Sequence, residues 1–346
     1  MSARLKIALI GAGLIGRRHA DLIAAEPTAE LCALADPAPA AAGIAQAHGV
    51  PCYASLNDLL AAHRPDGLII ATPNALHPPQ ALAAIAQGIP LLVEKPLADS
   101  AKAAATIVEA AEARGVPLLV GHHRRHNPLV IRAKAEITAG HLGRLVAVHG
   151  QFWLHKPDDY FNADWRRQPG AGPVLINLIH DIDLMRHFCG DIAAVQAINS
   201  SDIRGFAVED SAAALFQFGS GALGTLTASD TISAPWSWEM TANENPVYPA
   251  TDQHCYLIGG THGSLSLPQG VLWQHTGARS WWEPIAPKTL DVTPADPLTC
   301  QMAHFCAVIR GEASPLVTGR DGLAALQVID AIKQAAATGQ RTPIVP

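Results

Sequence analysis

The first 120 residues alternate short, unbroken runs of apolar residues with longer segments in which apolar residues recur every three or four positions. The short runs are typical of parallel strands buried on both faces, and the periodic segments are typical of helices. The runs predict strands at 5–10, 31–35, 67–71, 91–93 and 118–120, and the periodic segments predict helices at 16–25, 38–48, 56–62, 78–87 and 100–114. This alternation predicts a doubly wound parallel sheet, an α/β architecture.

The pattern changes after about residue 143. Runs in which apolar and polar residues alternate, or which are rich in β-branched residues, predict strands at 144–154, 192–199, 211–218, 222–228, 237–241 and 254–258. Turns that contain Gly, Pro, Asn and Asp join them. Helical periodicity predicts three helices, at 174–188, 299–310 and 322–337. The second part of the chain is therefore expected to be a mainly antiparallel sheet with helices, an α+β architecture.

The length of the chain favours two domains. A single hydrophobic core rarely extends through 346 residues. We place the first domain at 1–122 and the second at 123–346, with the last predicted helix a candidate to pack back toward the first domain. The segment 234–252, rich in Pro, Asn and Trp, is a candidate lid.

Composition and charge narrow the class of protein. Apolar residues make up 49% and charged residues 16%, which favours a well-buried globular protein over a disordered one. The net charge is −6 and basic residues form no run longer than two, so no nucleic-acid partner is expected. No apolar run reaches membrane-spanning length, the first residues lack a signal-peptide pattern, and the six cysteines show no CxxC pair. We expect a soluble cytoplasmic protein with reduced thiols.

A glycine-rich motif, Gly11-Ala12-Gly13-Leu14-Ile15-Gly16, lies between the first strand and the first helix. In this position glycines allow a pyrophosphate to approach the helix N-terminus, and Asp36, at the end of the second strand, can accept hydrogen bonds from a ribose. Asp36 is followed directly by Pro37 and Ala38, with no Arg or Lys there to receive a 2′-phosphate, which favours NAD over NADP. The cofactor-binding candidates in this region are Gly11, Gly13, Leu14, Ile15, Gly16 and Asp36. The alternative is a glycine-rich turn without a ligand.

Two further motifs follow predicted strands, at the sheet edge where ligands bind in α/β folds. The first is Thr72-Pro73-Asn74 with His77 one turn later, and the second is Glu94-Lys95-Pro96. A lysine at this edge can donate a hydrogen bond to a substrate hydroxyl and stabilise a developing alkoxide. Thr72, Asn74, His77, Glu94 and Lys95 are therefore candidates for the cofactor site. An ordinary Pro-Asn turn and a solvated strand end are the alternatives.

Taken together, these motifs resemble the Gfo/Idh/MocA oxidoreductases, named after glucose-fructose oxidoreductase, inositol dehydrogenase and a rhizopine catabolism protein. The resemblance extends nearly end to end, through residues 120–125, 165–166, 170–183, 258–265 and 321–323. It implies a Rossmann domain, an open-faced sheet domain with helices on one face that often mediates dimers or tetramers, and sugar or inositol substrates.

The resemblance also implies residue roles. Lys95 matches the lysine that orients the substrate hydroxyl, and His180, within Ile179-His180-Asp181-Ile182-Asp183, matches the acid/base histidine. A neutral imidazole suits proton abstraction near pH 7, and a lysine ammonium close by would favour the neutral form. Inositol dehydrogenase-like members carry an aspartate four residues before this histidine, where this chain has Ile176. The neighbouring Asn177 is expected to bind substrate but not to act as a base, because an amide does not take up the proton.

Other polar residues are candidates for contacts with the substrate. His123 and Arg124 follow the fifth strand and are expected to flank the nicotinamide and substrate, although a solvated basic turn is equally compatible with the pattern. His155, Tyr160, Trp165 and Arg166 lie on the segment that leads to the substrate in relatives. The nearby histidines 122, 123 and 126 suggest zinc, but adjacent side chains cannot all converge on one ion, and the family chemistry requires no metal. We expect no metal site, and we assign His254, Cys255 and His262 structural roles.

The sequence therefore predicts an NAD-dependent dehydrogenase that acts on a secondary alcohol of a sugar, inositol or other cyclic polyol, as a homodimer or homotetramer. Three alternatives stay open: a glycosidase or lyase that uses transient oxidation by a tightly bound NAD, a dihydrodiol dehydrogenase, and a non-catalytic dinucleotide sensor. The presence of both Lys95 and His180 argues against the sensor. The sequence does not identify the substrate.

Overall fold

The computed structural model describes residues 3–344, which divide into two compact units. Unit 1 contains the chain up to His126 together with residues 295–326, and unit 2 contains residues 127–294 and the chain from Gln327 onward. Residues 123–126 and 295–326, assigned to the second domain from sequence, thus belong to unit 1. The reason is physical: Met302 and Phe305, in the second of these segments, are buried in the hydrophobic core of unit 1.

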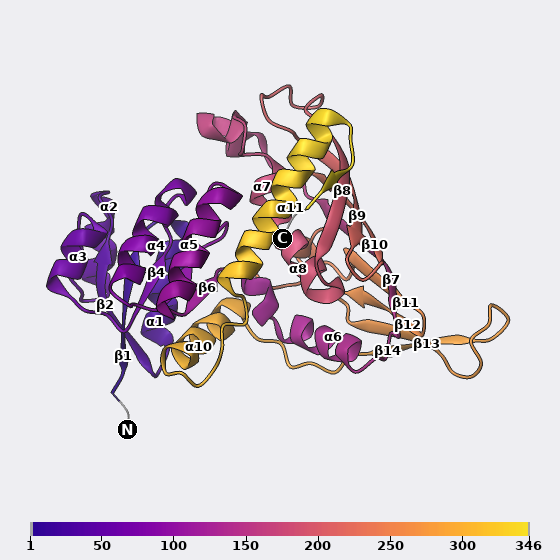
Figure 1. Ribbon diagram of the computed structural model, residues 1–346, viewed down its shortest axis with the longest axis horizontal. Coiled ribbons are helices and arrows are strands. Elements are labelled where there is room, and N and C mark those ends of the chain that lie inside the picture. Colours follow the sequence, from indigo (N-terminus) through magenta and orange to yellow (C-terminus); the bar gives the residue numbers. More distant parts are fainter. Residues whose placement is uncertain (1–2, 345–346) are drawn as a thin grey trace. The chain divides into compact units, whose positions relative to one another are not determined.

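Unit 1 is built on a six-stranded sheet in which every described strand pair is parallel (Figure 1). Its strands are β1 (Leu5–Ile10), β2 (Ala29–Ala35), β3 (Cys52–Tyr53), β4 (Gly67–Ile70), β5 (Leu91–Val93) and β6 (Leu118–Val120). The order β3-β2-β1-β4-β5-β6 is that of a dinucleotide-binding Rossmann domain. The predicted fold class is confirmed, although the two-residue strand β3 was not predicted.

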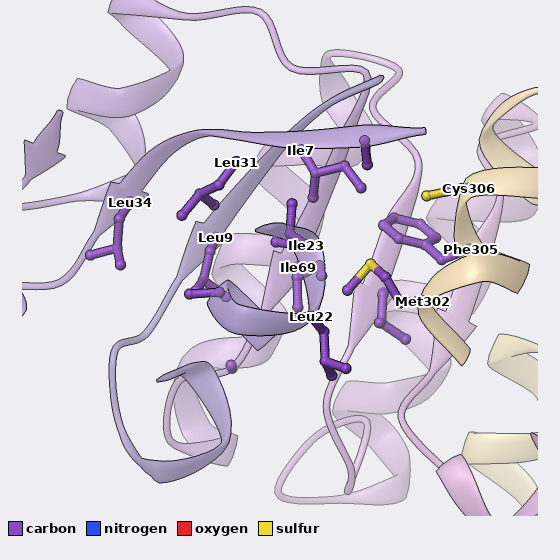
Figure 2. Packing of buried hydrophobic residues seen from close by; sticks show 14 of the residues in the cluster. Ile7, Leu9, Leu22, Ile23, Leu31, Leu34, Ile69, Met302, Phe305 and Cys306 are labelled. Atoms are coloured by element: carbon purple, nitrogen blue, oxygen red, sulfur yellow. The ribbon is translucent and has the colours of Figure 1, made fainter. Parts of the chain in front are cut away.

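The helices of unit 1 follow the predicted pattern. They are α1 (Leu14–Ala25), α2 (Ala40–Ala47), α3 (Leu56–Ala62), α4 (His77–Ala86), α5 (Ala101–Arg114) and α10 (Pro297–Ile309), with short 3₁₀ helices η1 (Asn74–Leu76) and η2 (His123–His126). Ser55 and Ser100 cap α3 and α5 through their hydroxyl oxygens. Figure 2 shows Ile7 and Ile69 of the sheet packed with Ile23 of α1 and with Phe305 of α10. The returning helix α10 therefore completes the core of this unit.

Unit 2 contains a nine-stranded sheet in the order β14-β13-β12-β11-β7-β10-β9-β8-β15 (Figure 1). The strands are β7 (Leu145–Trp153), β8 (Ile192–Ser200), β9 (Ser211–Phe218), β10 (Leu223–Ser229), β11 (Tyr256–Gly260), β12 (Gly263–Leu267), β13 (Val271–His275), β14 (Ile285–Thr289) and β15 (Thr342–Pro343). The β7/β10 pair is parallel and the other described pairs are antiparallel. The predicted mainly antiparallel sheet is confirmed.

Helices cover one face of this sheet. Those of unit 2 are α6 (Pro128–Thr138), α7 (Pro173–Ile176), α8 (Leu178–Cys189) and α9 (Trp238–Thr241), with 3₁₀ helices η3 (Asp158–Asn162) and η4 (Asp164–Arg167), while α11 (Gly319–Thr338) has residues in both units. Met185 of α8 packs directly on β7, because a Cβ added to Gly150 would lie 2.5 Å from its terminal methyl carbon. The other face is open and exposes apolar side chains, among them Ile198, Leu215, Leu223 and Leu257.

Several local predictions in unit 2 are corrected. Residues 237–241, predicted as a strand, form the helix α9, because the Ser237 hydroxyl accepts a hydrogen bond from the Met240 amide and caps a helical turn. The predicted helix 174–188 is two helices, α7 and α8, separated at Asn177. Helix α6 and strands β12 to β15 were not predicted. The candidate lid, 234–252, contains α9 with the buried Trp238.

The cysteines are free thiols of mixed exposure. Cys189, Cys255 and Cys306 are buried, Cys32 and Cys300 are partly buried, and Cys52 is exposed. Burial raises the pKa of the Cys189 thiol to about 12, so it stays protonated and unreactive near neutral pH. Within residues 3–344, no helix is both long and apolar enough to span a bilayer.

Candidate active site

The glycine loop between β1 and α1 has the geometry that a dinucleotide requires. Gly11 has a φ of +94°, and a Cβ at this position would lie 2.5 Å from both the carbonyl carbon and the oxygen of Ala71. A Cβ on Gly16 would overlap the Gly11 carbonyl oxygen, which holds the start of α1 against the turn. By contrast, a Cβ on Gly13 would meet no atom within 4 Å, so open space lies at the N-terminus of α1. Anionic groups are stabilised at such a helix end.

The carboxylate of Asp36 is fixed beside this loop. Oδ2 accepts a hydrogen bond from the Ala12 amide at 2.7 Å, and Oδ1 accepts one from the Ala38 amide at 2.7 Å. Asp36 lines a cavity with Ile10, Pro37, Thr72, Pro73, Leu76 and Gln80, among others. A mostly apolar cavity with one carboxylate in its wall fits the adenosine part of a dinucleotide. Leu14 is exposed and Ile15 partly exposed at the first turn of α1.

Substituting the glycines of this loop is expected to separate folding from cofactor binding. Gly11→Ala should lower the free energy of unfolding by roughly 2–4 kcal/mol, because it adds both a positive-φ strain and a clash with Ala71. Gly13→Ala should fold normally but bind NAD at least about tenfold more weakly, because its methyl group occupies the open space. Urea unfolding and NAD titration measure the two effects. A Gly13→Ala protein with normal NAD affinity would contradict this assignment.

Glu94, after β5, is anchored from α1. Its Oε1 lies 2.8 Å from Nε2 of His19, and its Oε2 accepts the backbone N–H of Lys95 at 3.1 Å. Burial raises the pKa of Glu94, but the His19 hydrogen bond and the positive charges near it outweigh burial, so the pKa is lowered overall. Glu94 is therefore an ionised, buried anchor for the loop that carries Lys95, whose own side chain is partly exposed.

His77 supports the strand ends from inside. Its side chain is 0% exposed, with Nε2 2.7 Å from the Thr72 carbonyl oxygen and Nδ1 3.0 Å from the Pro96 carbonyl oxygen. Burial lowers its pKa, so the ring is neutral near pH 7 and donates from one nitrogen at a time. In this structure the His77 ring therefore contacts the backbone of the two loops that follow β4 and β5. Asn74, in η1, keeps a partly exposed side chain, and Thr72 donates its hydroxyl to Gln80 at 2.6 Å.

The basic turn η2 follows β6. Arg124 and Arg125 are 2% and 5% exposed, and Arg125 donates to Asp321 at 3.2 Å, so the interpretation of a solvated basic turn is wrong. Burial, followed by the nearby Arg124 charge, lowers the pKa of His123 to about 4, so this ring is neutral at pH 7. No cluster of three or more potential metal-binding side chains is found in residues 3–344.

In unit 2, the predicted substrate-binding residue Asn177 lies at the break between α7 and α8, and the predicted acid/base His180 follows it. Asn177 has a φ of −104° and a ψ of −55°, and its carbonyl oxygen accepts the His180 amide at 3.1 Å. His180 lies in the first turn of α8 and is 7% exposed. The next residue of α8, Asp181, is fully buried and accepts a hydrogen bond from the Tyr256 hydroxyl, which ties the helix to β11.

A buried lysine, Lys156, joins these residues and was not singled out by sequence. Its Nζ donates to Oδ1 of Asn177 at 2.9 Å and lies 5.1 Å from the centre of the Tyr160 ring. The guanidinium of Arg166 stacks on the Tyr160 ring, 4.0 Å from its centre, and donates a hydrogen bond to the Tyr160 carbonyl oxygen. The structure thus brings together Lys156, Tyr160, Arg166 and Asn177 within unit 2.

The remaining two predicted residues are exposed. Trp165, in η4, is 57% exposed, and its ring centre lies 5.3 Å from the Arg166 guanidinium. His155 follows β7, with Nδ1 3.4 Å from the Thr231 carbonyl oxygen. Both are therefore surface residues, and neither contributes a hydrogen bond to Asn177.

Comparison with known proteins assigns the family. A profile of the "Oxidoreductase family, NAD-binding Rossmann fold" matches residues 5–122, and one of the "GFO/IDH/MocA C-terminal domain" matches residues 130–266. The chain belongs to the Gfo/Idh/MocA family. This confirms the resemblance stated from sequence, the oxidoreductase class and NAD as the cofactor of the first domain.

Three relatives illustrate the family. The chain is 30% identical to an inositol 2-dehydrogenase of Rubrobacter xylanophilus, over 95% of this chain and 90% of that protein. It is 32% identical to the rhizopine catabolism protein MocA of Rhizobium meliloti, in a match that spans 54% of this chain and 58% of that protein. The WlbA dehydrogenase of Bordetella pertussis, solved with NADH and UDP-GlcNAcA, has 27% identity, a TM-score of 0.79 and 99% coverage of both chains. The two of these three that match over 90% or more of both chains are named dehydrogenases.

Proposed function

We propose that this Gfo/Idh/MocA protein is an NAD-dependent dehydrogenase that oxidises a secondary alcohol of a cyclic polyol, such as an inositol or a sugar, to the ketone, reversibly. The observation that carries the proposal is the anchoring of the Lys95 loop: His19 of the glycine-loop helix holds Glu94, and Glu94 holds the Lys95 backbone. A relative named inositol 2-dehydrogenase that matches over 95% of the chain supports a polyol as substrate.

In the proposed reaction Lys95 donates a hydrogen bond to the reacting hydroxyl and stabilises negative charge on its oxygen. His180 takes the hydroxyl proton, as a neutral imidazole can near pH 7. Bound NAD⁺ supplies the acceptor for the carbon-bound hydride. Asn177 and the partly exposed ring of Tyr160 hold the other oxygens and the ring of the polyol. His123, neutral because its pKa is about 4, adds no positive charge that would compete with Lys95.

The test mixes purified protein and NAD⁺ with a panel of inositols, sugars, anhydro-sugars and cyclic diols. The absorbance of the NADH formed is followed at about 340 nm over a time on the order of seconds to minutes. A signal with a cyclic diol but no polyol would favour a dihydrodiol dehydrogenase. No net NADH with any of them, together with cleavage of a glycoside by protein that carries NAD, would overturn the proposal in favour of a redox-assisted glycosidase or lyase.

Asp36 is expected to set the preference for NAD over NADP. The carboxylate accepts hydrogen bonds from ribose hydroxyls but repels a 2′-phosphate, and the two residues directly after it, Pro37 and Ala38, are not basic. Asp36→Asn keeps the shape and one acceptor oxygen but removes the charge, so the ratio of kcat/KM for NAD over NADP should fall by about tenfold or more. Asp58→Asn, at an exposed position on α3, is the matched control. An unchanged ratio in Asp36→Asn would assign the preference to other residues.

We also propose that the open face of the unit 2 sheet is covered by a second copy of the chain in a cytoplasmic homodimer or homotetramer. Leu215 and Leu223 on neighbouring strands are 54% and 62% exposed, and Ile198 is 70% exposed. Apolar side chains concentrated on one sheet face favour burial against an identical face. Light scattering of the wild type and of Leu215→Lys distinguishes an assembly through this face from a monomer.

A further inference from the structure

Lys156 is a buried cation whose shortest side-chain contact is with an amide oxygen. Lys156 is 7% exposed, and its Nζ lies 2.9 Å from Oδ1 of Asn177 and 3.6 Å from Oδ2 of Asp230, while the Glu239 carboxylate also acts on it electrostatically. The closer of the two is the neutral amide. A buried ammonium that makes its shortest contact to an amide oxygen, and not to a carboxylate, polarises that amide.

The position of Lys156 is rigidly determined. Its amide donates to the Asp230 carbonyl oxygen at 2.9 Å, and its own carbonyl oxygen accepts from Arg204 at 2.8 Å. Arg204 also donates from Nε to Asp230 Oδ1 at 2.8 Å, and its guanidinium stacks 4.2 Å from the Phe161 ring centre. Both the backbone and the charged neighbours of Lys156 are therefore locked, which suits a residue that orients another.

The contact decides which way the Asn177 amide faces. An ammonium group has three donors and no acceptor, so only Oδ1 can face Lys156. Nδ2 must then point away with its two N–H donors, and no hydrogen bond from Nδ2 is found in the described part of the chain, residues 3–344. Asn177 is partly exposed, so this donor is within reach of a ligand.

We propose that Lys156 is a positioning residue that holds Asn177 so that its amide donates a hydrogen bond to an acceptor oxygen of the polyol. This rests on the proposed function and specifies it: the substrate must present a lone pair there, from a hydroxyl, carbonyl or carboxylate oxygen. A carboxylate side chain at this position would instead accept a hydrogen bond from a substrate hydroxyl. Because the Asn177 amide donates a hydrogen bond where a carboxylate would accept one, it can bind a substrate oxygen that carries no proton.

Kinetics of matched variants test the proposal. Lys156→Met and Asn177→Ala should each raise KM for the polyol by about 2- to 10-fold, as expected for loss of one hydrogen bond between neutral groups, and leave the Kd for NAD unchanged. Lys156→Arg, which keeps the donors, should recover much of the loss. The double variant should be no worse than Asn177→Ala, because Lys156 acts through Asn177. Additive effects, or wild-type KM in Lys156→Met, would overturn the proposal.

Lys134→Met is the matched control, because Lys134 in the same unit also donates to an oxygen, the His187 carbonyl, at 2.6 Å. It should leave KM unchanged. A second measurement needs no activity: the side-chain amide ¹⁵N signal of Asn177, assigned by its loss in Asn177→Ala. We expect this signal to move in Lys156→Met, to return toward its original position in Lys156→Arg, and to stay in Lys134→Met. An unmoved signal in Lys156→Met rejects the inference even if polyols are oxidised, whereas a moved signal without any NADH formation rejects only the proposed function.

Discussion

Replacing Lys95 by methionine is expected to lower kcat for polyol oxidation by about 10³-fold, with NAD affinity retained. Loss of a preorganised donor to a developing oxyanion costs on the order of 10²–10³ in kcat, and loss of proton-transfer support adds to it. The loop should survive the change, because Glu94 holds it through the Lys95 backbone amide, which the substitution keeps. Steady-state NADH formation and an NAD titration measure the two quantities.

The control for this variant is Lys102→Met, an exposed lysine on α5 of the same unit, which should keep wild-type kcat. If Lys95→Met keeps kcat within about tenfold of the wild type, Lys95 does not touch the reacting oxygen and the proposed mechanism is wrong. If it loses NAD affinity as well, Lys95 serves chiefly to hold the cofactor.

The first unit was predictable because its information is local. The predicted strands 5–10, 91–93 and 118–120 match β1, β5 and β6, since a buried parallel strand is a short apolar run that ends at a polar or glycine turn. Strand β3 has two residues, which is too short for any periodicity to reveal. The contribution of α10 to this unit also escaped prediction, because it depends on contacts between residues more than 200 positions apart, such as Phe305 with the sheet.

The second unit was less predictable because the local signals in its sequence compete with one another. Residues 237–241 have strand-like alternation, but the Ser237 cap favours a helical turn and decides the outcome. Strand β12, Gly-Ser-Leu-Ser-Leu, contains too few apolar residues to be distinguished from a loop. Helix α6 did carry a signal, Asn127 as N-cap followed by Pro128 at the first helical position, and attention to that pair would have found it.

In the candidate site, too, residues with a local sequence signal were predicted and residues that depend on distant contacts were not. Motifs at strand ends located Gly11, Asp36 and Lys95, since their chemistry follows from their place on the sheet. Lys156 and His19 were missed, because each matters through a partner far away in the chain: Asn177 is 21 residues from Lys156, and Glu94 is 75 residues from His19. A buried charge is a functional signal only once its burial is known, and sequence alone does not reveal it.

His180→Ala is expected to reduce kcat for polyol oxidation by about 10²- to 10⁴-fold, the usual contribution of a general base. Added imidazole should restore part of the rate in His180→Ala, because a small base can enter the space left by the 7%-exposed ring, and it should not restore Lys95→Met. His187→Ala, near the end of the same helix α8, is the control and should keep wild-type kcat.

The Lys95→Met/His180→Ala double variant should lose less than the product of the single losses, because groups that act on one hydroxyl fail together. Full activity of His180→Ala, or a double variant whose losses multiply, would mean that His180 is not the base for the same hydroxyl.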